Sequence, residues 1–364
     1  MAFLKNFSHF LYLIRIGIGT QPMDGGNSIA SSGTVDWNAI ENLAYTHGLS
    51  AVLLDGVEKM PVSMHPPKEM LLHWIGNTLQ SYESRYEKYR RTIAEMAAFY
   101  NAHGFKMMIL KGYACSLDWP KPEHRPCGDI DIWQFGQQQE ADDIVTREKG
   151  IKISSSHQHH TVFEWNGFAV ENHYDFINVH HHKSNVEIEV ILKELGQDDN
   201  HYVEMSGERV YLPSPNLHAL FLLRHSMSNF ASTGLSFRQL LDWAFFVEKH
   251  GKEVDWKWLL KMLDKYGMTP LFNIYNAICV ENLGFDERLF PSIDFDPSLK
   301  DRILKDMLTP EFSEIEKGGF IRRAIYKYRR WKANAWKHGL CFRESMWSAF
   351  WSGVWNHLLK PKSI

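Results

Sequence analysis

Apolar residues recur at helical spacing through the first part of the chain. Residues 7–18 form an amphipathic pattern of this kind. Asp36 and Gly48 are typical start and stop signals around a second apolar repeat. A third repeat runs through residues 67–104 and carries an apolar stripe along most of its length. These patterns predict an N-terminal helical region over residues 1–104.

The pattern changes after residue 104, where short apolar runs replace the long repeats. Four of these runs are typical of strands: residues 105–110, 127–134, 160–165 and 168–176. The last two flank Asn166-Gly167, a dipeptide that suits a two-residue hairpin turn with positive φ angles. A helix is expected over residues 140–149, before a stop at Gly150. The segment 105–200 is therefore predicted to be an α+β core.

Helical spacing returns in the second half of the chain. Helices are expected over residues 184–195, 216–229, 237–250 and 256–266. We therefore expect a C-terminal helical region over residues 201–316, followed by a tail over residues 317–364. The predicted fold class is α+β, with a small mixed sheet flanked by N-terminal and C-terminal helical segments. Apart from this spacing of apolar residues, no segment of the sequence is repeated along the chain.

Composition narrows the class of protein further. A chain of 364 residues that is 44% hydrophobic and 23% charged is typical of a folded protein of two or three domains. The net charge of −3 excludes a generic polyanion binder. Four cysteines lie far apart and form no C-x-x-C pair, which argues against a disulfide scaffold and a zinc ribbon: Cys115, Cys127, Cys279 and Cys341. With no apolar run of the roughly 18 residues that a membrane span needs, a cytoplasmic location is expected.

Charge is segregated along the chain although the total is small. The tail contains eleven Lys and Arg but one acid, Glu344, so the rest of the chain carries an excess of negative charge. Aromatic residues such as Tyr326, Trp331 and Trp336 are interleaved with the basic ones. This combination can bind nucleic acid by charge and stacking. It can equally form an amphipathic helix on the acidic body, and we expect that docked arrangement.

The most informative short motif is Gly128-Asp129-Ile130-Asp131-Ile132. Side chains alternate between the two faces of a strand, so Asp129 and Asp131 are expected on one face and the isoleucines in the core. Two adjacent carboxylates repel each other unless a cation lies between them. Carboxylate oxygens suit Mg²⁺, which one or two of them commonly hold together with substrate phosphates. The motif therefore indicates a magnesium site, although D-x-D alone is a weak signal.

Basic and glycine residues near this motif are candidates for binding phosphate. The strand expected at 105–110 leads into Lys111-Gly112 before a helix. A glycine there would let a phosphate approach the backbone, and a helix N-terminus favours an anion. Lys111 and Arg125 could add positive charge, and Gly128 precedes the carboxylates. The alternative is an ordinary strand-to-helix turn with solvated basic side chains.

A third carboxylate follows from the parity of the second hairpin strand. Glu171 and His173 fall on its polar face, while Phe168 and Val170 fall on the apolar one. A third acid beside a D-x-D strand would complete a two-metal site, where one ion activates a hydroxyl and the other neutralises the leaving group. The alternative is a solvated outer face of the hairpin. Glu187 and Glu189 form a weaker alternative for the third acid, because their segment is more typical of a helix.

Three strings together resemble a known family: Leu110-Lys111-Gly112, Arg125-x-x-Gly128-Asp129-Ile130-Asp131 and Gly167-x-x-Val170-Glu171-Asn172-His173-Tyr174. They are similar to motifs of the bacterial uncharacterised nucleotidyltransferase family, a branch of the DNA polymerase beta-type nucleotidyltransferase superfamily. The helical segments on either side resemble that family as well. One departure is Tyr113, which follows Gly112 where the superfamily usually has Gly-Ser or Gly-Gly.

The resemblance implies transfer of a nucleoside monophosphate from an NTP to an acceptor hydroxyl, with release of pyrophosphate. It implies that Asp129 and Asp131 bind two Mg²⁺ ions and that Glu171 completes the metal site and helps to deprotonate the acceptor. Lys111, Gly112 and Arg125 would hold the phosphates. The acceptor stays open between an RNA, a protein, a sugar and a small molecule. The alternative, motivated by Tyr113, is an inactive nucleotidyltransferase fold that binds a nucleotide or RNA.

Other polar residues have simpler expected roles. Seven histidines are crowded into one stretch: His157, His159, His160, His173, His180, His181 and His182. Imidazole is a good zinc ligand, but the last three are consecutive and point in different directions, so no physiological metal site is expected there. Arg238 and Asp242 are spaced for an ion pair on a helix surface. His225 is expected to be a packing residue rather than a base.

Overall fold

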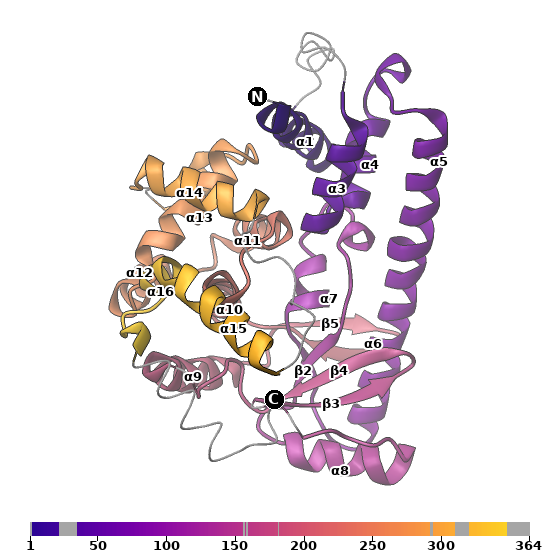
Figure 1. The fold of residues 1–364 in the computed structure, drawn as a ribbon. Helices are drawn as coiled ribbons and strands as arrows, with labels where there is room; N and C mark the ends of the chain where they lie inside the picture. The colour runs from indigo at the N-terminus through magenta and orange to yellow at the C-terminus, as the bar shows by residue number, and fades with distance from the viewer. Residues whose placement is uncertain are drawn as a thin grey trace.

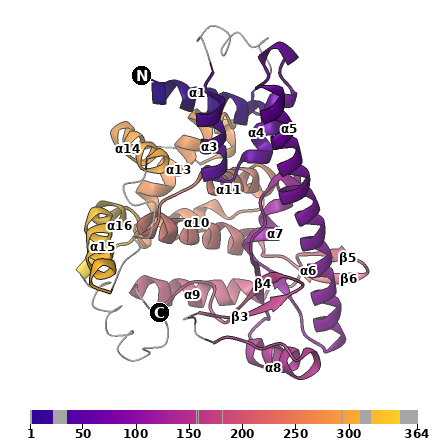
Figure 2. The same cartoon turned by 45° about the vertical axis from the view of Figure 1, so that its right-hand side comes forward.

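The computed structural model describes residues 2–21, 35–155, 157, 159–180, 182–291, 294–309 and 320–347. Figure 1 shows a sheet set between a long helix on one flank and a group of C-terminal helices on the other. Figure 2, turned by 45°, shows the same order. The fold is α+β, as predicted, and its six strands form one mixed sheet.

The N-terminal region is helical, as predicted. Its elements are α1 (Ala2–Ile18), α3 (Trp37–His47), α4 (Ser50–Glu58), a 3₁₀ turn (Val62–Met64), α5 (Lys68–Asn77), a π-helical segment (Thr78–Glu83) and α6 (Ser84–Ala102). The Asp36 carboxylate accepts a hydrogen bond from the Ala39 amide, and Gly48 ends α3 with a φ of +69°. Both signals therefore act as the sequence indicates.

The helix expected over residues 67–104 is continuous from α5 to α6, but its apolar stripe is broken. Tyr86 and Tyr89 of α6 are buried, whereas Leu72 is 57% exposed and Leu79 is 51% exposed. The π-helical segment Thr78–Glu83 lies between them. Because its wider turns rotate the following residues about the helix axis, one stripe at regular spacing does not stay on one face.

The sheet has the strand order β3-β4-β2-β1-β6-β5. Its strands are β1 (Met108–Ile109), β2 (Ile130–Trp133), β3 (His160–Trp165), β4 (Phe168–His173), β5 (Tyr202–Met205) and β6 (Glu208–Tyr211). β2 runs parallel to β4 and β1 runs parallel to β6, whereas the other neighbours are antiparallel. β1, β2 and β4 are shorter than predicted. The β3–β4 hairpin is confirmed, with φ of +51° at Asn166 and +80° at Gly167.

The sheet extends past residue 200, where we expected the core to end. β5 and β6 fall in the segment assigned to the C-terminal helical region, and β6 pairs with β1. Their turn is Ser206-Gly207, with φ of +52° and +84°. Ser-Gly is a weaker turn signal than Asn-Gly, and both strands are only four residues long. The expected boundary at 200 therefore separates two strands from the sheet to which they belong.

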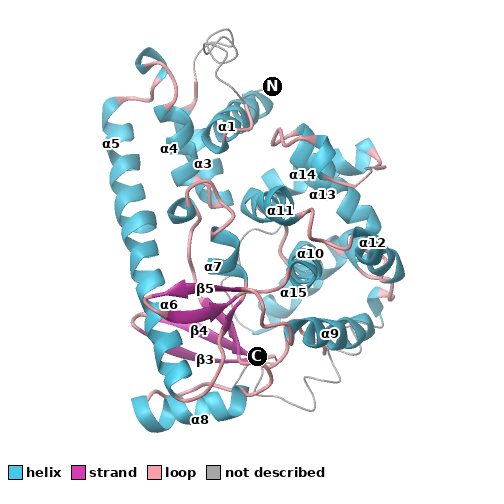
Figure 3. Ribbon diagram, turned by 180° about the vertical axis from the view of Figure 1, so that it is seen from behind, coloured by secondary structure: helices cyan, strands magenta, loops and turns pink. Residues whose placement is uncertain are grey.

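Helices cover both faces of the sheet. On one face, Ile130 and Ile132 of β2 lie in a core cluster with residues of α6 and of α8 (Gln138–Lys149). On the other face, Trp133 packs against Phe176, which packs against Phe221 of α10 (Pro215–Ser232). Figure 3 shows the strands gathered between α6 and the C-terminal helices. Alternate residues of β2 therefore face two different cores.

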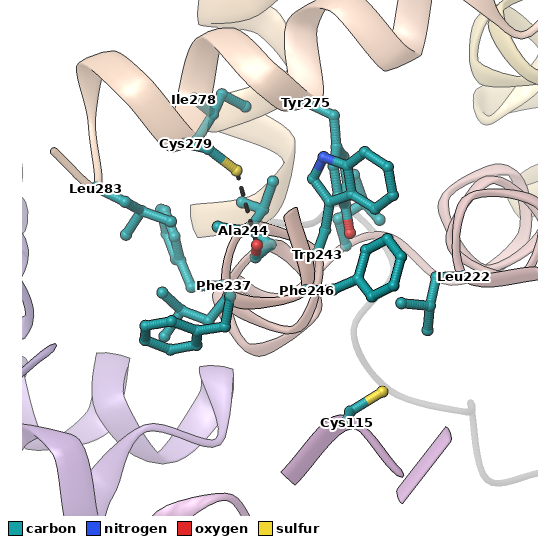
Figure 4. Close-up of a cluster of buried hydrophobic side chains, with 14 of the residues drawn as sticks. Cys115, Leu222, Phe237, Trp243, Ala244, Phe246, Tyr275, Ile278, Cys279 and Leu283 are labelled. Atoms are coloured by element: carbon teal, nitrogen blue, oxygen red, sulfur yellow. Dashed lines mark hydrogen bonds between the residues drawn. The ribbon is translucent and has the colours of Figure 1, made fainter. Parts of the chain in front are cut away.

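The C-terminal region is mostly helical beyond the sheet. Its elements are α9 (Lys183–Gly196), α10, α11 (Phe237–His250), α12 (Trp256–Lys265), α13 (Thr269–Glu281), a 3₁₀ turn (Glu287–Leu289), α14 (Pro297–Leu308), α15 (Phe320–Ala333) and α16 (Ala335–Cys341). Figure 4 shows Trp243 of α11 beside Tyr275 of α13 and Phe246 of α11 beside Leu222 of α10. The Cys279 thiol of α13 donates to the Leu240 carbonyl of α11. Cys115 of α7 (Lys111–Ser116) lies on the other side. The helix α11 therefore joins the sheet domain to the C-terminal helices.

The described part of the basic tail docks on the body, as expected. The Lys337 ammonium of α16 lies 2.6 Å from a carboxylate oxygen of Asp306 in α14. Arg330 donates to the Ser232 carbonyl at 2.8 Å, and the Trp336 ring packs against Phe230 of α10. Residues 348–364 lie outside the described part of the chain. No helix in the described ranges is both long and apolar enough to cross a membrane.

A close contact between α1 and α4 generates a test of packing. A Cβ added at Gly56 would lie 2.1 Å from the Leu13 carbonyl oxygen, so Gly56→Ala forces the two helices apart. We expect it to lower the free energy of unfolding by about 1–3 kcal/mol, as over-packed cores do. Gly76→Ala in α5 meets no atom within 4 Å and should raise it by roughly 0.5–1 kcal/mol. Urea unfolding measures whether each variant lowers or raises the free energy of unfolding. An equal change in the two variants would contradict the close contact between α1 and α4.

Candidate functional site

Asp131 and Glu171 lie side by side on neighbouring parallel strands. The register of β2 and β4 pairs Asp131 with Glu171, so both side chains project from the same face of the sheet. His173 follows on that face of β4, and the antiparallel register of β3 places His160 opposite it. The structure therefore brings together two of the three expected acids and adds two imidazoles to them.

Short contacts connect these groups. An oxygen of Asp131 lies 2.6 Å from the Lys111 ammonium and 3.0 Å from Nε2 of His173. The Glu171 carboxylate lies 3.6 Å from Nε2 of His173 and 3.6 Å from Nε2 of His160. One ligand atom each from Asp131, Glu171 and His173 lies within 4.8 Å of the others. The donor atoms are thus close enough to share one cation.

The charges at this site perturb one another. Burial would raise the pKa of Asp131, but the charge of Lys111 and the hydrogen bond from His173 outweigh it and hold that pKa well below its usual value. Asp129 lies exposed just before β2. Desolvation, together with the negative charges of Asp131 and Glu171, raises the pKa of the Asp129 carboxyl. The charges of the three acids therefore influence one another, and the positive charge near Asp129 does not offset the negative charge around it.

Lys111 is held in an uncommon backbone conformation at the start of α7. Its φ is +37°, in the left-handed region that residues other than glycine seldom adopt. Burial lowers the pKa of its ammonium, but the charge of Asp131 outweighs burial and raises it. The ammonium also lies 5.8 Å from the centre of the Phe221 ring of α10. Backbone strain of this kind concentrates at functional sites, and here it aims a cation at the carboxylates.

Gly112 makes room for a protein side chain. A Cβ at this position would lie 2.6 Å from the hydroxyl of Tyr89, which donates to the Asp129 carbonyl at 2.8 Å. Tyr113 is buried, and its ring stacks on Tyr86 in the core between α6 and the sheet. Gly128 is exposed, with no atom within 4 Å of an added Cβ. The glycine of the Lys-Gly turn therefore lets Tyr89 hold the backbone just before β2.

Arg125 is committed to an acid far away in the sequence. Its guanidinium forms a two-point ion pair with Asp242 of α11, at 2.7 and 2.9 Å, and its third nitrogen donates to the Pro126 carbonyl. Asp242 also accepts from the Trp119 indole at 2.9 Å. The expected Arg238–Asp242 pair is therefore wrong, because Asp242 is occupied by Arg125. The contacts of Arg125 are those of a structural residue and include none of the three site acids.

The two alternative acids do not join the site. Glu189 of α9 accepts hydrogen bonds from the backbone amides of Phe176 and Ile177, at 2.9 and 3.0 Å. Burial raises its pKa to about 7. Glu187 pairs with Lys265 on the surface. Their segment is helical, so their even spacing does not place them on one strand face.

Two histidines of the site, His159 and His160, were not assigned by motif comparison, and a third histidine, His225, responds to the charges of the site. The two-residue turn fixes the register that pairs His160 with His173, so the hairpin signal itself could have identified His160. His159 precedes it, and its ring centre lies 5.5 Å from that of His173. His225 of α10 was expected to be a packing residue, and Asn229 donates to its Nε2 at 3.0 Å. Burial and the charge of Lys111 lower the pKa of His225 to about 3, so its imidazole is neutral.

Comparison with known proteins gives one match to a protein family. Residues 33–284 match the family described as "Uncharacterised nucleotidyltransferase". A search of curated proteins found no match. Among solved structures, the chain is similar to an antigenic nucleotidyltransferase-like protein from Paracoccidioides brasiliensis, at 14% identity over 44% of this chain and 75% of that one. The TM-score is 0.32, so this similarity assigns no role to any residue.

The ion pair of Arg125 generates a prediction about stability. Arg125→Ala leaves the Asp242 carboxylate buried without its cation, and we expect the free energy of unfolding to fall by about 3–5 kcal/mol. Arg288→Ala is the matched control, because it removes an ion pair of which the arginine is 90% exposed, and its effect should stay within about 0.5 kcal/mol. Urea unfolding of both variants is the measurement. A loss at Arg125 no larger than at Arg288 would contradict the structural role.

Proposed function

The chain belongs to the uncharacterised nucleotidyltransferase family, and we propose that it transfers a nucleoside monophosphate from an NTP to an acceptor hydroxyl, releasing pyrophosphate. The observation that carries this proposal is the in-register pair of Asp131 and Glu171 beside the Lys111 ammonium. Acids and a cation in this arrangement can bind a metal-bound polyphosphate. Phosphoryl transfer depends mainly on such positioning and charge neutralisation.

The acids of the site fit a divalent cation. Asp131 and Glu171 offer oxygen atoms close together, and desolvation together with the charges of these two acids raises the pKa of Asp129. We propose that Asp129, Asp131 and Glu171 hold two Mg²⁺ ions. When bound, such ions neutralise the phosphates and lower the pKa of the attacking hydroxyl. Glu171 is the acid that we propose takes the proton of the acceptor, because it is less buried than Asp131.

Lys111 is the cation that we propose binds the phosphates. Its ammonium already contacts Asp131, so it adjoins any phosphate held at the carboxylates. Arg125 has a different role in this proposal, since its ion pair with Asp242 fixes the segment that leads into β2. Gly112 leaves room for the Tyr89 hydroxyl next to the acids. The expected location in the cytoplasm stays a prediction from the spacing of the cysteines.

A second function is favoured by one observation. The residue after Gly112 is a tyrosine whose ring is buried against Tyr86, so it supplies no hydroxyl to a phosphate at that turn. A protein that binds a nucleotide or RNA without transferring a nucleotide would tolerate this loss. Nucleotide binding without pyrophosphate release from any of the four NTPs would identify this second function. The acceptor for transfer stays open between an RNA, a protein, a sugar and a small molecule.

The first test of function removes one acid. Asp131→Asn takes away the charge that Lys111 and a cation share, so we expect magnesium-dependent pyrophosphate release to fall at least about 100-fold, as when one electrostatic stabiliser is lost. The assay contains an NTP, Mg²⁺ and a labelled cell extract, which supplies candidate acceptors. Glu187→Gln is the matched control, because this acid lies on the surface with Lys265, and it should keep wild-type activity. Equal activity of the two variants would disprove the assignment of Asp131.

The second test separates function from stability at Asp129. Asp129→Asn removes a negative charge from beside two others, so its melting temperature without metal should be unchanged or higher. Pyrophosphate release should fall as in the Asp131 variant. Differential scanning calorimetry and the same assay measure the two effects. A large drop in melting temperature would instead indicate a structural role for Asp129.

A further inference from the structure

Three imidazoles converge on the same face of the hairpin as the acids. One ring nitrogen each from His159, His160 and His173 lies within 4.8 Å of the others. The ring centre of His160 lies 4.4 Å from that of His159 and 5.1 Å from that of His173. Consecutive positions place His159 and His160 on different sides of their chain, but the start of β3 turns both rings toward β4. The hairpin register accounts for the pairing of His160 with His173, whereas the approach of His159 depends on the chain just before β3.

The side chain of His160 is buried, and its ring nitrogens form no hydrogen bond with the described residues. Only 5% of the residue is exposed, and within the described ranges neither ring nitrogen has a hydrogen-bond partner. Its closest acid, Glu171, lies 3.6 Å away, beyond hydrogen-bond distance. Nδ1 of His159 is likewise buried, and no described residue forms a hydrogen bond with it. A buried polar atom without a hydrogen-bond partner destabilises the fold, and a ligand bound to these nitrogens would offset that loss.

His173 has the contacts of a metal ligand. Its Nδ1 faces the Asp175 carbonyl at 3.1 Å, and its Nε2 faces Asp131 at 3.0 Å. Both neighbours are acceptors, so the ring satisfies both only as an imidazolium or with a metal cation in place of the Nε2 proton. A histidine that binds a metal through one nitrogen usually donates its other N–H to a carbonyl or a carboxylate. The Asp175 carbonyl is placed for that second contact.

We propose that His159, His160 and His173 form a site for a transition metal ion of the zinc class, which adjoins, through His173, the acids that would hold Mg²⁺. Three histidines are a common zinc ligand set, with the fourth position open or filled by a further ligand, and Glu171 adjoins two of the rings. Mg²⁺ prefers oxygen ligands and would not compete well for these nitrogens. The site is therefore selective by the chemistry of its donors.

The geometry suits such an ion. One ring nitrogen from each histidine already lies within 4.8 Å of the others. Nitrogens on one tetrahedral zinc lie roughly 3.4 Å apart, given Zn–N distances of about 2.1 Å, so small rotations of the rings close the site.

Metal binding by the purified protein tests this site without any substrate. Protein without a histidine tag is stripped with a chelator, reloaded with Zn²⁺ in the presence of excess Mg²⁺, dialysed and analysed for metal. We expect one zinc ion per chain. Loading with Co²⁺ should give the strong visible absorption of a four-coordinate site. Absence of retained zinc, or its displacement by Mg²⁺, would overturn the proposal.

Variants then locate the ion. His160→Ala should weaken zinc binding more than about 100-fold, beyond the 10–100-fold expected when only an outer partner of a ligand is lost. His157→Ala is the matched control, because its exposed ring stacks on His160 at 4.6 Å but lies outside the ligand group, and it should keep zinc. Equal weakening in both would show unspecific binding to a histidine-rich surface. His159→Ala serves as a second variant if His160→Ala does not fold, as circular dichroism will show.

The outcome is independent of nucleotidyl transfer. Asp129 lies outside the three-histidine group, so Asp129→Asn should lose pyrophosphate release while retaining zinc. Zinc binding without pyrophosphate release in the wild type would contradict the proposed function alone. Pyrophosphate release without zinc binding would contradict this site alone.

Discussion

A carboxylate taken out of water is strongly destabilising unless cations and hydrogen-bond donors replace the water, and only 3% of Asp131 is exposed. Two elements provide the replacement. Lys111 comes from the start of α7, and His173 comes from the end of β4. The cation of Lys111 reaches Asp131 only because the chain turns sharply there, with a positive φ. The geometry around this one carboxylate therefore fixes how the turn, the central strand and the hairpin meet.

The sheet explains why charged and apolar residues can alternate at its centre. Ile130 and Ile132 enter the core beneath α6 and α8, so β2 is anchored by its apolar face. The opposite face is free to hold Asp131 close to α10, where Phe221 contacts Lys111. Because a one-residue slip would exchange the two faces, the burial of the isoleucines also holds the acid in place. The site thus depends on apolar packing that lies on the other side of the sheet.

Local signals in the sequence were enough to predict much of the fold. Asp36 and Gly48 bound α3, and Asn166-Gly167 forms the hairpin turn, because each acts within a few residues of itself. The parity of β4 placed Glu171 and His173 on one face for the same reason. The strands β5 and β6 were not predicted, since each has four residues and gains its stability from its neighbours in the sheet rather than from its own pattern: β6 pairs with β1, and β5 pairs with β6.

Contacts between distant residues could not be predicted in this way. Arg125 was expected at the phosphates, but its partner Asp242 lies 117 positions later in the chain. The neighbour that requires Gly112 is Tyr89, which a different helix supplies. Motif comparison identifies which residues recur together, whereas the packing of separate elements decides whether each one acts in chemistry or in structure. The histidines are a partial exception, because the two-residue turn already fixes the pairing of His160 with His173.

The two-residue turn between β3 and β4 gives the chain an unequal tolerance of insertions and deletions. Most surface turns accept an added residue at little cost, because the flanking elements keep their own contacts. Here the turn sets which residue of β3 lies opposite His173. One residue gained or lost at Asn166-Gly167 would shift the register and carry His160 to the opposite face. Among relatives of this protein, the length of this turn should therefore vary together with the presence of the paired histidines.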